Sequence, residues 1–532
     1  MSVIFGLYGS NHSACASLMI DGEIISCIEE ERMTRIKAGY SHNSYPDLAV
    51  QKIEEITGIK VKDADYNVFV EPFPVGYAKR LTNNNFEVMS HHESHCYGAY
   101  FTSGFQDKCI VLSYDGGGLT SVLRVYLCED GKMTLIKKGH WADYGSLSHL
   151  WGFATASIMG YDFQGESVWR MCKDEGKLMG MAPNGRYDES IYNTLKTCID
   201  YEKGSLQFFP SGTNQRTKFV VDTLFRQDYF VTQEGKEVFS YNLQKLTEDL
   251  FLDFLDDLHN LYPEYKKLCF SGGLFGNVKL NQKINELPWV DEIYVLPPMG
   301  DEGLALGACI FKANQLGEYI KPKKLKNVFF GTSFTDEEVL EISKSYDVIR
   351  RPYVSKEIAS LLDEGKIIGW FDGKFEHGPR ALGARSILVK PTELSTHKVL
   401  NTRLKRHDTM PFAPIVMEDY FDDIFTCPKS KYGAQFMTIC FSTKEEWIDM
   451  IPAVIQKTDK TARPQVVNKD NLPKLWEILD EYREISGIPV LLNTSFNAHD
   501  EPIIENPTHA LDHLKNGIID ELVIGNYVYI RK

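Results

Sequence analysis

Residues 3–11, VIFGLYGSN, and residues 16–31, ASLMIDGEIISCIEEE, contain the pattern that decides the fold. An apolar strand ends in a loop of small and polar residues, and two more apolar runs follow it. These runs are joined by Asp21-Gly22. Asp-Gly between apolar runs is a strong hairpin signal, because the tight turn needs residues that tolerate a positive φ. The segment therefore predicts a strand, a polar loop and a hairpin.

The same arrangement recurs 109 residues further along the chain. Residues 109–118, CIVLSYDGGG, form the second strand and loop, and residues 121–139 form a second hairpin with Asp130-Gly131 at its turn. A duplicated unit of this kind resembles the sugar kinase, Hsp70 and actin superfamily, in which the two loops face each other across a nucleotide cleft. Apolar periodicity predicts helices at 92–103, 147–159, 241–261 and 303–314, which gives an α/β pattern.

A second domain is expected after the basic segment KPKKLKN at 321–327. A new alternation of strands and helices begins with GKIIGWFDG at 365–373. We place the boundary between 335 and 352, and define the domains as 1–345 and 346–532. Strands are predicted at 367–371, 386–391, 437–442, 489–496 and 521–530, and helices near 394–404, 471–485 and 506–516, so this domain is also α/β or α+β.

The composition of the 532 residues favours a folded cytoplasmic enzyme with a small-molecule substrate. No run of about 18 apolar residues is present, so no membrane span is expected. The 11 cysteines include no CxxC pair, which argues against a disulfide framework or a cysteine zinc site and fits a reducing cytoplasm. The net charge of -15 gives no general attraction for phosphate backbones, so no nucleic-acid partner is expected.

Two histidines and two aspartates are candidate metal ligands. His91 and His95 are four residues apart in a helical stretch and would project from one face, whereas His92 would point elsewhere. Asp115 and Asp301 each follow a strand and stand beside glycines. Such a set suits Fe(II), Mn(II) or Zn(II). Alternatively, the histidines are surface or capping residues, and Asp301 is a helix N-cap.

The glycine loop SGGLFGN at 271–277 lies between an apolar strand and a helix. Its backbone N–H groups are placed to receive a phosphate or a ribose at the start of the helix. A tight turn from strand to helix explains the glycines equally well. The candidate nucleotide contacts here are Gly272, Gly273 and Asn277.

The C-terminal domain carries arginines, lysine and hydroxyl or amide side chains near the ends of apolar strands. Arginine donates two parallel hydrogen bonds to phosphate oxygens, so the pattern predicts a polyphosphate ligand. The alternative for any single arginine is a salt bridge on a solvated face. The candidates are Arg385, Ser386, Lys405, Arg406, Arg463, Ser495 and Asn497.

Taken in order, the motifs resemble the NodU/CmcH family of O-carbamoyltransferases over nearly the whole chain. The resemblance implies a TsaD-like domain of the actin/Hsp70 superfamily followed by a YrdC-like α/β domain. The motifs that carry it are the His12 loop, GEIISCIEEERMTRIK, HHESH, YDGGG, DEGKLMGMAP, GDEGLALGA, GPRALGARSIL, MPFAP, TARPQVV and NTSFN.

This resemblance also implies a reaction scheme. Carbamoyl phosphate and ATP, the latter with Mg²⁺, give carbamoyl adenylate in the YrdC-like domain with loss of pyrophosphate and phosphate. The carbamoyl group then passes to a hydroxyl of a small-molecule or sugar acceptor in the TsaD-like domain. The oligomeric state, monomer or homodimer, stays open.

The family's functional residues are expected at the matching positions of this chain. His91, His95, Asp115 and Asp301 would hold iron, and His12 would be the base for the acceptor hydroxyl. The C-terminal candidates would contact carbamoyl phosphate and ATP. Ser13 stands where the family commonly has aspartate, so a carboxylate that orients His12 must come from elsewhere.

Three other functions compete with this hypothesis. Transfer of threonylcarbamoyl to tRNA uses the same two domain types, but the chain is acidic and has no basic stripe. An ATP-driven sugar or acetate kinase leaves the histidine pair and the C-terminal half without a role. A non-catalytic nucleotide-binding module is expected to lack at least one of the four candidate ligands, and all four are present.

Overall fold

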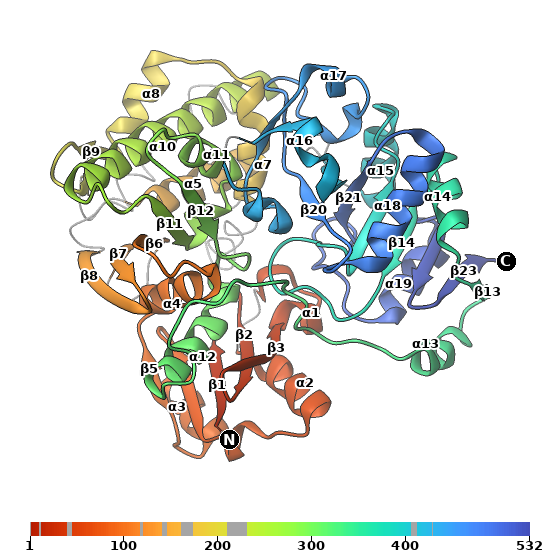
Figure 1. The fold of residues 1–532 in the computed structure, drawn as a ribbon, viewed down its shortest axis with the longest axis horizontal. Helices are drawn as coiled ribbons and strands as arrows, with labels where there is room; N and C mark the ends of the chain where they lie inside the picture. The colour runs from red at the N-terminus through yellow and green to blue at the C-terminus, as the bar shows by residue number, and fades with distance from the viewer. Residues whose placement is uncertain are drawn as a thin grey trace. The chain divides into compact units, whose positions relative to one another are not determined.

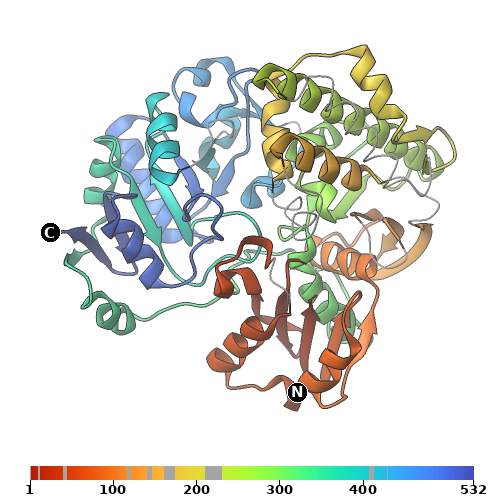
Figure 2. The same cartoon turned by 180° about the vertical axis from the view of Figure 1, so that it is seen from behind.

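The computed structural model describes residues 2–9, 12–39, 45–116, 121–140, 146–160, 174–209, 231–405, 412–427 and 429–532. The chain divides into two compact units, Met1–Leu325 and Lys326–Lys532. In Figures 1 and 2 the first unit runs from red to green and the second continues to blue.

The boundary between the two units lies at 325/326, twenty residues before the predicted boundary at 345/346. Residues 326–345 already contact the second unit. The N–H of Gly331 donates to the carbonyl of Phe375 at 3.0 Å, and Thr332 Oγ1 donates to Glu505 Oε1 at 2.7 Å. The basic segment at 321–327 therefore spans the change of unit.

The first sheet of the N-terminal unit has the strand order β3-β2-β1-β4-β5. The strands β1, β2 and β3 pair antiparallel, whereas β4 pairs parallel to β1 and β5 parallel to β4. Asp21 and Gly22 both have positive φ, which confirms the predicted Asp-Gly turn. The bounds are β1 Val3–Tyr8, β2 Cys15–Ile20, β3 Glu23–Glu29, β4 Tyr66–Val70 and β5 Glu87–Met89.

The second sheet repeats this topology with the order β12-β11-β6-β7-β8. Again three strands form an antiparallel meander, and two more pair parallel to its first strand and to each other. The predicted duplication of an α/β unit is thereby confirmed. The bounds are β6 Cys109–Tyr114, β7 Leu123–Glu129, β8 Lys132–Gly139, β11 Lys267–Ser271 and β12 Glu292–Val295.

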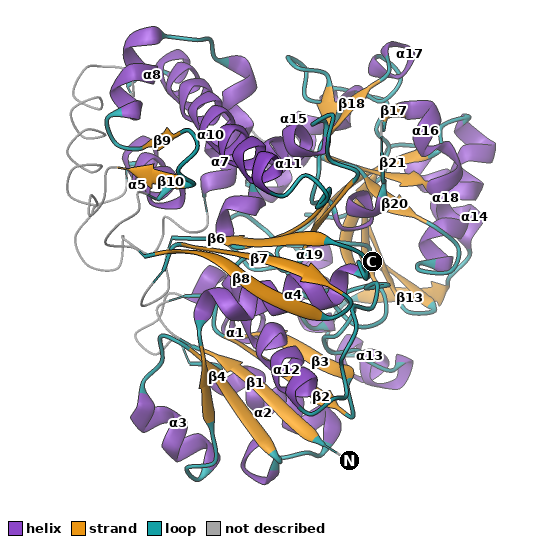
Figure 3. Ribbon diagram, turned by 60° about the vertical axis from the view of Figure 1, so that its left-hand side comes forward, coloured by secondary structure: helices purple, strands orange, loops and turns teal. Residues whose placement is uncertain are grey.

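Helices α4 (His91–Ser103) and α12 (Leu304–Gln315) lie between the two sheets (Figure 3). They cross closely, because a Cβ on Gly307 would lie 2.1 Å from the carbonyl oxygen of Ser94. Ser94 Oγ also donates to the carbonyl of Leu304 at 2.6 Å. This crossing brings the starts of the two helices together.

Other helices cover the sheets of the N-terminal unit. The long helix α10 contacts α5, α7, α8 and α11, which form one helical layer. The predicted helix at 147–159 matches α5, whereas α10 begins eight residues before the predicted start at 241. The remaining bounds are α1 Glu30–Thr34, α2 Asp47–Thr57, α3 Val75–Thr82, α5 Leu147–Met159, α7 Glu175–Met181, α8 Glu189–Lys196, α10 Gln233–Leu261, α11 Val278–Asn285, β9 Asp200–Glu202 and β10 Gln207–Phe209.

The C-terminal unit is built on an eight-stranded mixed sheet of order β13-β23-β22-β14-β15-β21-β16-β20. This sheet confirms the α/β class; the likeness to YrdC stays a prediction. The strands are β13 Val348–Pro352, β14 Ile368–Phe371, β15 Arg385–Val389, β16 Ala413–Met417, β20 Gln465–Val467, β21 Val490–Ser495, β22 Glu521–Ile524 and β23 Tyr527–Arg531. The helices are α13 Asp336–Ser343, α14 Ser355–Asp363, α15 Ser395–Leu404, α16 Phe421–Ile424, α17 Glu445–Ile448, α18 Pro473–Ser486 and α19 Pro507–Lys515.

The strand predicted at 437–442 is mostly absent. A small separate sheet contains β17 (Phe425–Thr426), β18 (Phe441–Thr443) and β19 (Thr461–Ala462), so the strand begins only at Phe441. Met437 has a φ of 54°, and the N–H and Oγ1 of Thr438 both donate to the carbonyl of Gly433. The backbone therefore turns where an extended conformation was expected.

Among the helices that the structure describes, none is long and apolar enough to span a bilayer.

Candidate functional site

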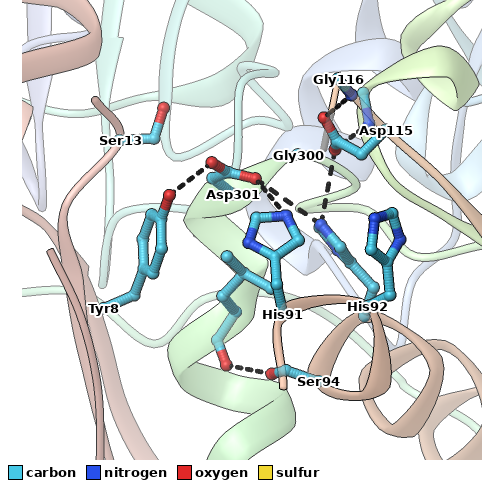
Figure 4. Close-up of polar contacts among 12 residues, drawn as sticks. Tyr8, Ser13, His91, His92, Ser94, Asp115, Gly116, Gly300 and Asp301 are labelled. Carbon is cyan, nitrogen blue, oxygen red and sulfur yellow. Dashed lines mark hydrogen bonds and ion pairs between the residues drawn. The ribbon is translucent and has the colours of Figure 1, made fainter. Parts of the chain in front are cut away.

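Four predicted ligands converge in the N-terminal unit. One ligand atom from each of His91, His95, Asp115 and Asp301 lies within 4.8 Å of the other three. His91 Nε2 lies 3.3 Å from Asp301 Oδ1, and His95 Nε2 lies 3.6 Å from that same oxygen and 3.5 Å from Asp115 Oδ2. Figure 4 shows the side chains of His91 and Asp301 pointing toward one another. We call these four residues the metal cluster.

A divalent cation fits the metal cluster. Both ring nitrogens of His91 and Nε2 of His95 are buried and make no hydrogen bond to any part of the chain that is described. Buried polar atoms normally have a partner, so these nitrogens leave room for a ligand between them and the carboxylates. Two imidazoles and two carboxylates form a donor set suited to first-row divalent metals.

The charges of the metal cluster are strongly coupled. Burial disfavours the charged form of His95, but the carboxylates of Asp115 and Asp301 outweigh this effect and raise its pKa to about 9. Burial likewise opposes ionisation of Asp115, yet contact with His95 lowers its pKa to about 2. In Asp301, the nearby His91 and His12 overcome the effect of burial and hold the pKa well below its usual value. Protons on the imidazoles therefore compete with a cation for this position.

His92 has a different environment from its two neighbours. Its Nε2 lies 2.7 Å from the carbonyl of Ser121, and its Nδ1 lies 2.9 Å from Ser113 Oγ. A carbonyl only accepts hydrogen bonds, so Nε2 carries a proton. Burial, together with the charges of His91 and His95, lowers the pKa of His92. His92 is thus a structural histidine, as its predicted direction implied.

The glycine loop at 271–277 supports Asp115. The N–H of Gly273 donates to Asp115 Oδ2 at 2.7 Å, and the N–H of Gly116 donates to Oδ1. Gly272 has a φ of 105°, and a Cβ there would lie 2.3 Å from the carbonyl oxygen of Tyr114. The amide of Gly273, predicted to receive a phosphate, therefore serves a carboxylate in this structure.

Asn277, the third predicted nucleotide contact of this loop, caps α11. Its Oδ1 accepts the N–H of Leu280 at 3.0 Å, and its side-chain amide exchanges hydrogen bonds with Gln244. The helix cap and Gln244 thus account for both ends of the side chain.

Asp301 is not the capping residue that was considered as an alternative. The short 3₁₀ turn Asp301–Gly303 begins after Gly300 and has no side-chain cap. Instead, Asp301 Oδ2 accepts a hydrogen bond from Tyr8 at 2.7 Å. Tyr8 was not among the predicted site residues, because no local motif marks the last residue of β1.

His12 lies at the edge of the metal cluster. Its Nε2 is 3.6 Å from Asp301 Oδ2, its Nδ1 is 3.2 Å from Ser13 Oγ, and its side chain is 20% exposed. The carboxylate near His12 is therefore Asp301, and Ser13 supplies a hydroxyl where the resembling family commonly has a carboxylate.

In the C-terminal unit, Arg385 is buried within the framework. Its Nη1 donates to the carbonyls of Asp372, Gly373 and Ala384, and its Nη2 donates to that of Thr332. Its guanidinium carbon lies 3.5 Å from the centre of the Phe371 ring. The Oγ of Ser386 accepts the N–H of Gly383 at 3.2 Å. Backbone contacts thus use much of the hydrogen-bonding capacity of both side chains.

Arg463 differs from Arg385 in its hydrogen bonds. In both side chains Nε is buried without a hydrogen-bond partner and no described carboxylate forms an ion pair, but only Arg385 donates from its Nη groups to backbone carbonyls of the described residues. Burial lowers the pKa of this guanidinium. A buried cation without a counter-charge is stabilised by an anionic ligand. Arg463 is therefore the strongest anion-binding candidate in this unit.

The other C-terminal candidates lie on separate segments of the chain. Ser495 Oγ donates to Asn497 Oδ1 at 2.6 Å, and Asn497 Nδ2 donates to the carbonyl of Glu501. Ser386 and Ser495 are register partners on β15 and β21. Lys405 is exposed at the end of α15 with a left-handed φ of 56°. Arg406 lies outside the described residues.

A pocket of 670 Å³ opens in the C-terminal unit near the start of α18. Trp370, Trp476 and Lys474 line it together with Gly383 and Ala384 of the GPRALGARS segment. None of the predicted anion contacts lines this pocket, so it is separate from Arg463 and Ser495.

Comparison with known proteins defines the class of the protein as a carbamoyltransferase. Residues 73–310 match the family described as Carbamoyltransferase N-terminus, and residues 359–531 match Carbamoyltransferase C-terminus. The chain belongs to this family, whose nodulation-protein relatives include NolNO, NolO and nodulation protein U.

Two relatives align over almost the whole chain. Protein MJ1051 of Methanocaldococcus jannaschii is 31% identical over 97% of this chain and 98% of its own length. Nodulation protein NolNO of Sinorhizobium fredii is 29% identical over 97% of this chain and 78% of its own length. Among solved structures, component A of (R)-2-hydroxyglutaryl-CoA dehydratase from Acidaminococcus fermentans matches 58% of this chain and 97% of its own, at 15% identity and a TM-score of 0.37.

Proposed function

We propose that this carbamoyltransferase is ATP-dependent and transfers the carbamoyl group to a hydroxyl of a small-molecule or sugar acceptor in a biosynthetic pathway. The observation that carries the proposal is the convergence of His91, His95, Asp115 and Asp301 on one buried position. These residues would hold Fe²⁺ or another divalent cation. A cation held there would supply Lewis-acid chemistry for the carbamoyl carbonyl.

The residues around the metal cluster have distinct tasks in this proposal. His12 takes the proton of the acceptor hydroxyl as the new oxygen–carbon bond forms. The bond between the carbamoyl carbon and the adenylate oxygen breaks, and AMP leaves. Asp301 Oδ2, at 3.6 Å from His12 Nε2, stabilises the imidazolium that results. The buried setting of His91 and His95 limits competing hydrolysis by water.

The C-terminal domain, residues 346–532 in our assignment, would form the adenylate. Carbamoyl phosphate is hydrolysed to carbamate and phosphate, and carbamate attacks the α-phosphate of Mg²⁺-ATP with release of pyrophosphate. Arg463 would balance the phosphate charge, because its guanidinium lacks a carboxylate partner among the described residues. Lys405, Arg406, Ser495 and Asn497 are proposed as further contacts, while Arg385 and Ser386 would shape the site through their backbone hydrogen bonds.

The setting proposed for this activity is the cytoplasm. The net charge of -15 favours a small-molecule acceptor over a nucleic acid. Either a monomer or a homodimer is compatible with the scheme.

The test separates the two half-reactions. His91→Ala and Asp301→Ala should abolish carbamoyl transfer, while exchange of pyrophosphate into ATP in the presence of carbamoyl phosphate should continue. His259→Ala is the control, because His259 stacks on Trp289 at 4.3 Å and has no contact with the metal cluster. Transfer is read by mass spectrometry as the gain of one carbamoyl group across a panel of hydroxylated acceptors. Loss of both activities in His91→Ala, with the control unaffected, would contradict the two-site scheme.

A further inference from the structure

Tyr8, the last residue of β1, contacts two members of the metal cluster. Its hydroxyl donates to Asp301 Oδ2 at 2.7 Å. Its ring meets the ring of His91 edge-on, with the centroids 5.9 Å apart and the planes at 71°. Only 2% of Tyr8 is exposed. Tyr8 is therefore placed to fix the direction of the Asp301 carboxylate.

The two oxygens of Asp301 have different neighbours. Oδ1 faces Nε2 of His91 at 3.3 Å and Nε2 of His95 at 3.6 Å. Oδ2 points away from these nitrogens toward the Tyr8 hydroxyl (Figure 4). His12 Nε2 lies 3.6 Å from this second oxygen. The phenol thus occupies one oxygen and leaves the other for the position shared by the histidines.

The backbone holds both partners in place. Tyr8 pairs with Cys15 of β2, and β1 runs against the first turn of α12. A Cβ on Gly6 would lie 1.9 Å from the carbonyl oxygen of Ala305, so strand and helix touch through their backbones. Asp301 stands just before this turn. The packing of β1 against α12 therefore restricts the movement of both Tyr8 and Asp301.

We propose that Tyr8 is a positioning residue that makes Asp301 bind the cation through Oδ1 alone. The inference rests on the proposed function, because it requires a cation at the metal cluster. Without the phenol hydrogen bond, the carboxylate is free to rotate and to offer both oxygens. Loss of a partner that orients a metal ligand typically weakens metal binding by about 10- to 100-fold.

The experiment titrates the full-length chain with Co²⁺, whose visible absorption depends on its coordination number and geometry. Tyr8→Phe keeps the ring and removes only the hydroxyl. The matched control is Tyr201→Phe, because Tyr201 is 7% exposed and its hydroxyl donates to Asp257 at 2.6 Å. We expect the Kd for Co²⁺ to rise about tenfold or more in Tyr8→Phe, and the spectrum at saturation to change. Tyr201→Phe should keep the affinity and spectrum of the parent chain.

Each failure has its own signature. Unchanged affinity and spectrum in Tyr8→Phe would overturn the inference while the metal cluster stands. An equal loss in both variants would also overturn it, since a general weakening of the fold would then explain the effect. If neither the parent chain nor His91→Ala bound Co²⁺, the proposal of a metal site would itself fail. Circular dichroism and thermal unfolding of each variant establish that the chain is folded before titration.

Discussion

The Nδ1 atom of His95 lies 2.9 Å from the Oγ of Ser271, and that hydroxyl lies 3.1 Å from the carbonyl of Met299. A carbonyl only accepts, so the serine hydrogen points to Met299 and its oxygen accepts from Nδ1–H of His95. The proton of the neutral imidazole is then on Nδ1, and the lone pair is on Nε2. Ser271 thereby selects the tautomer that suits a metal ligand.

Replacing Ser271 by alanine should weaken metal binding. His95 would lose the acceptor that holds its Nδ1 proton, and we expect the Kd for Co²⁺ to rise about tenfold. Isothermal titration calorimetry measures the change. Ser113→Ala is the matched control, since Ser113 Oγ contacts the corresponding nitrogen of His92, which is not in the metal cluster. A similar loss in both serine variants would show that the effect does not depend on the tautomer of His95.

Replacing Gly307 by alanine should destabilise the N-terminal unit. The new Cβ would lie 2.1 Å from the carbonyl oxygen of Ser94, so α4 and α12 must move apart. Overpacking of this kind costs about 1–3 kcal/mol, and the movement also separates Asp301 from His91. Thermal unfolding with and without Co²⁺ should show a lower Tm and a smaller stabilisation by the metal.

Gly76→Ala is the control for this prediction. Gly76 lies in α3, and a Cβ there meets no heavy atom within 4 Å. Alanine should therefore raise the unfolding free energy by about 0.5–1 kcal/mol through its helix propensity. If Gly307→Ala behaved like Gly76→Ala, the close crossing of α4 and α12 would be wrong.

Replacing Arg463 by methionine should stop adenylate formation. The substitution removes a cation that lacks a carboxylate partner among the described residues, so a loss of fold stability is not expected. We expect pyrophosphate exchange to fall by at least about a hundredfold, as for a lost charge-assisted pair to phosphate of roughly 3 kcal/mol. Arg351→Met is the control, because Arg351 pairs with Glu357 and Glu521. Normal pyrophosphate release by Arg463→Met would remove this residue from the site.

Replacing Glu30 by glutamine should change the pH dependence of stability. Burial raises the pKa of Glu30 to about 7, although its carboxylate accepts the N–H groups of Leu48 and Ala49. Between pH 4.5 and 7 the folded chain keeps a proton that the unfolded chain has released, so stability falls as the pH rises through this window. The glutamine variant lacks this penalty and should gain roughly 3 kcal/mol relative to the parent between these limits.

Urea unfolding at several pH values tests the Glu30 prediction. At pH 4.5 the parent carries the proton in the folded state, so the comparison there isolates the loss of one hydrogen-bond acceptor. A constant difference between the two chains from pH 4.5 to 7.5 would contradict the raised pKa of Glu30.

The sequence was most informative where structure depends on neighbouring residues. The turns at Asp21-Gly22 and Asp130-Gly131 follow from the need for positive φ, and they located both hairpins. Apolar periodicity located α5 and α19 to within about two residues, as expected for long periodic segments. The four metal candidates were found because histidine spacing and strand-end aspartates are local patterns too.

Local sequence patterns could not predict contacts between residues that are far apart in the sequence. Tyr8 and Asp301 are 293 residues apart, so the sequence around Tyr8 gives no indication of their hydrogen bond. The amide of Gly273 was expected to hold a phosphate because its loop precedes a helix, and in this structure it donates to Asp115, which directly follows the neighbouring strand β6. The left-handed turn at Met437, a residue that rarely adopts it, shortened a strand that apolar composition alone had predicted.

The spread of the metal cluster along the chain has a consequence for biosynthesis. Its members are synthesised in three separate segments of the chain: first His91 and His95, then Asp115, and last Asp301. Chains are made from the N-terminus, and domains generally fold as units. The ribosome must therefore synthesise almost the whole N-terminal unit before it adds Asp301, the last carboxylate of the metal cluster. A nascent chain halted before residue 301 would hold three of the four donors, so complete loading of the proposed cation would require translation of nearly the whole unit.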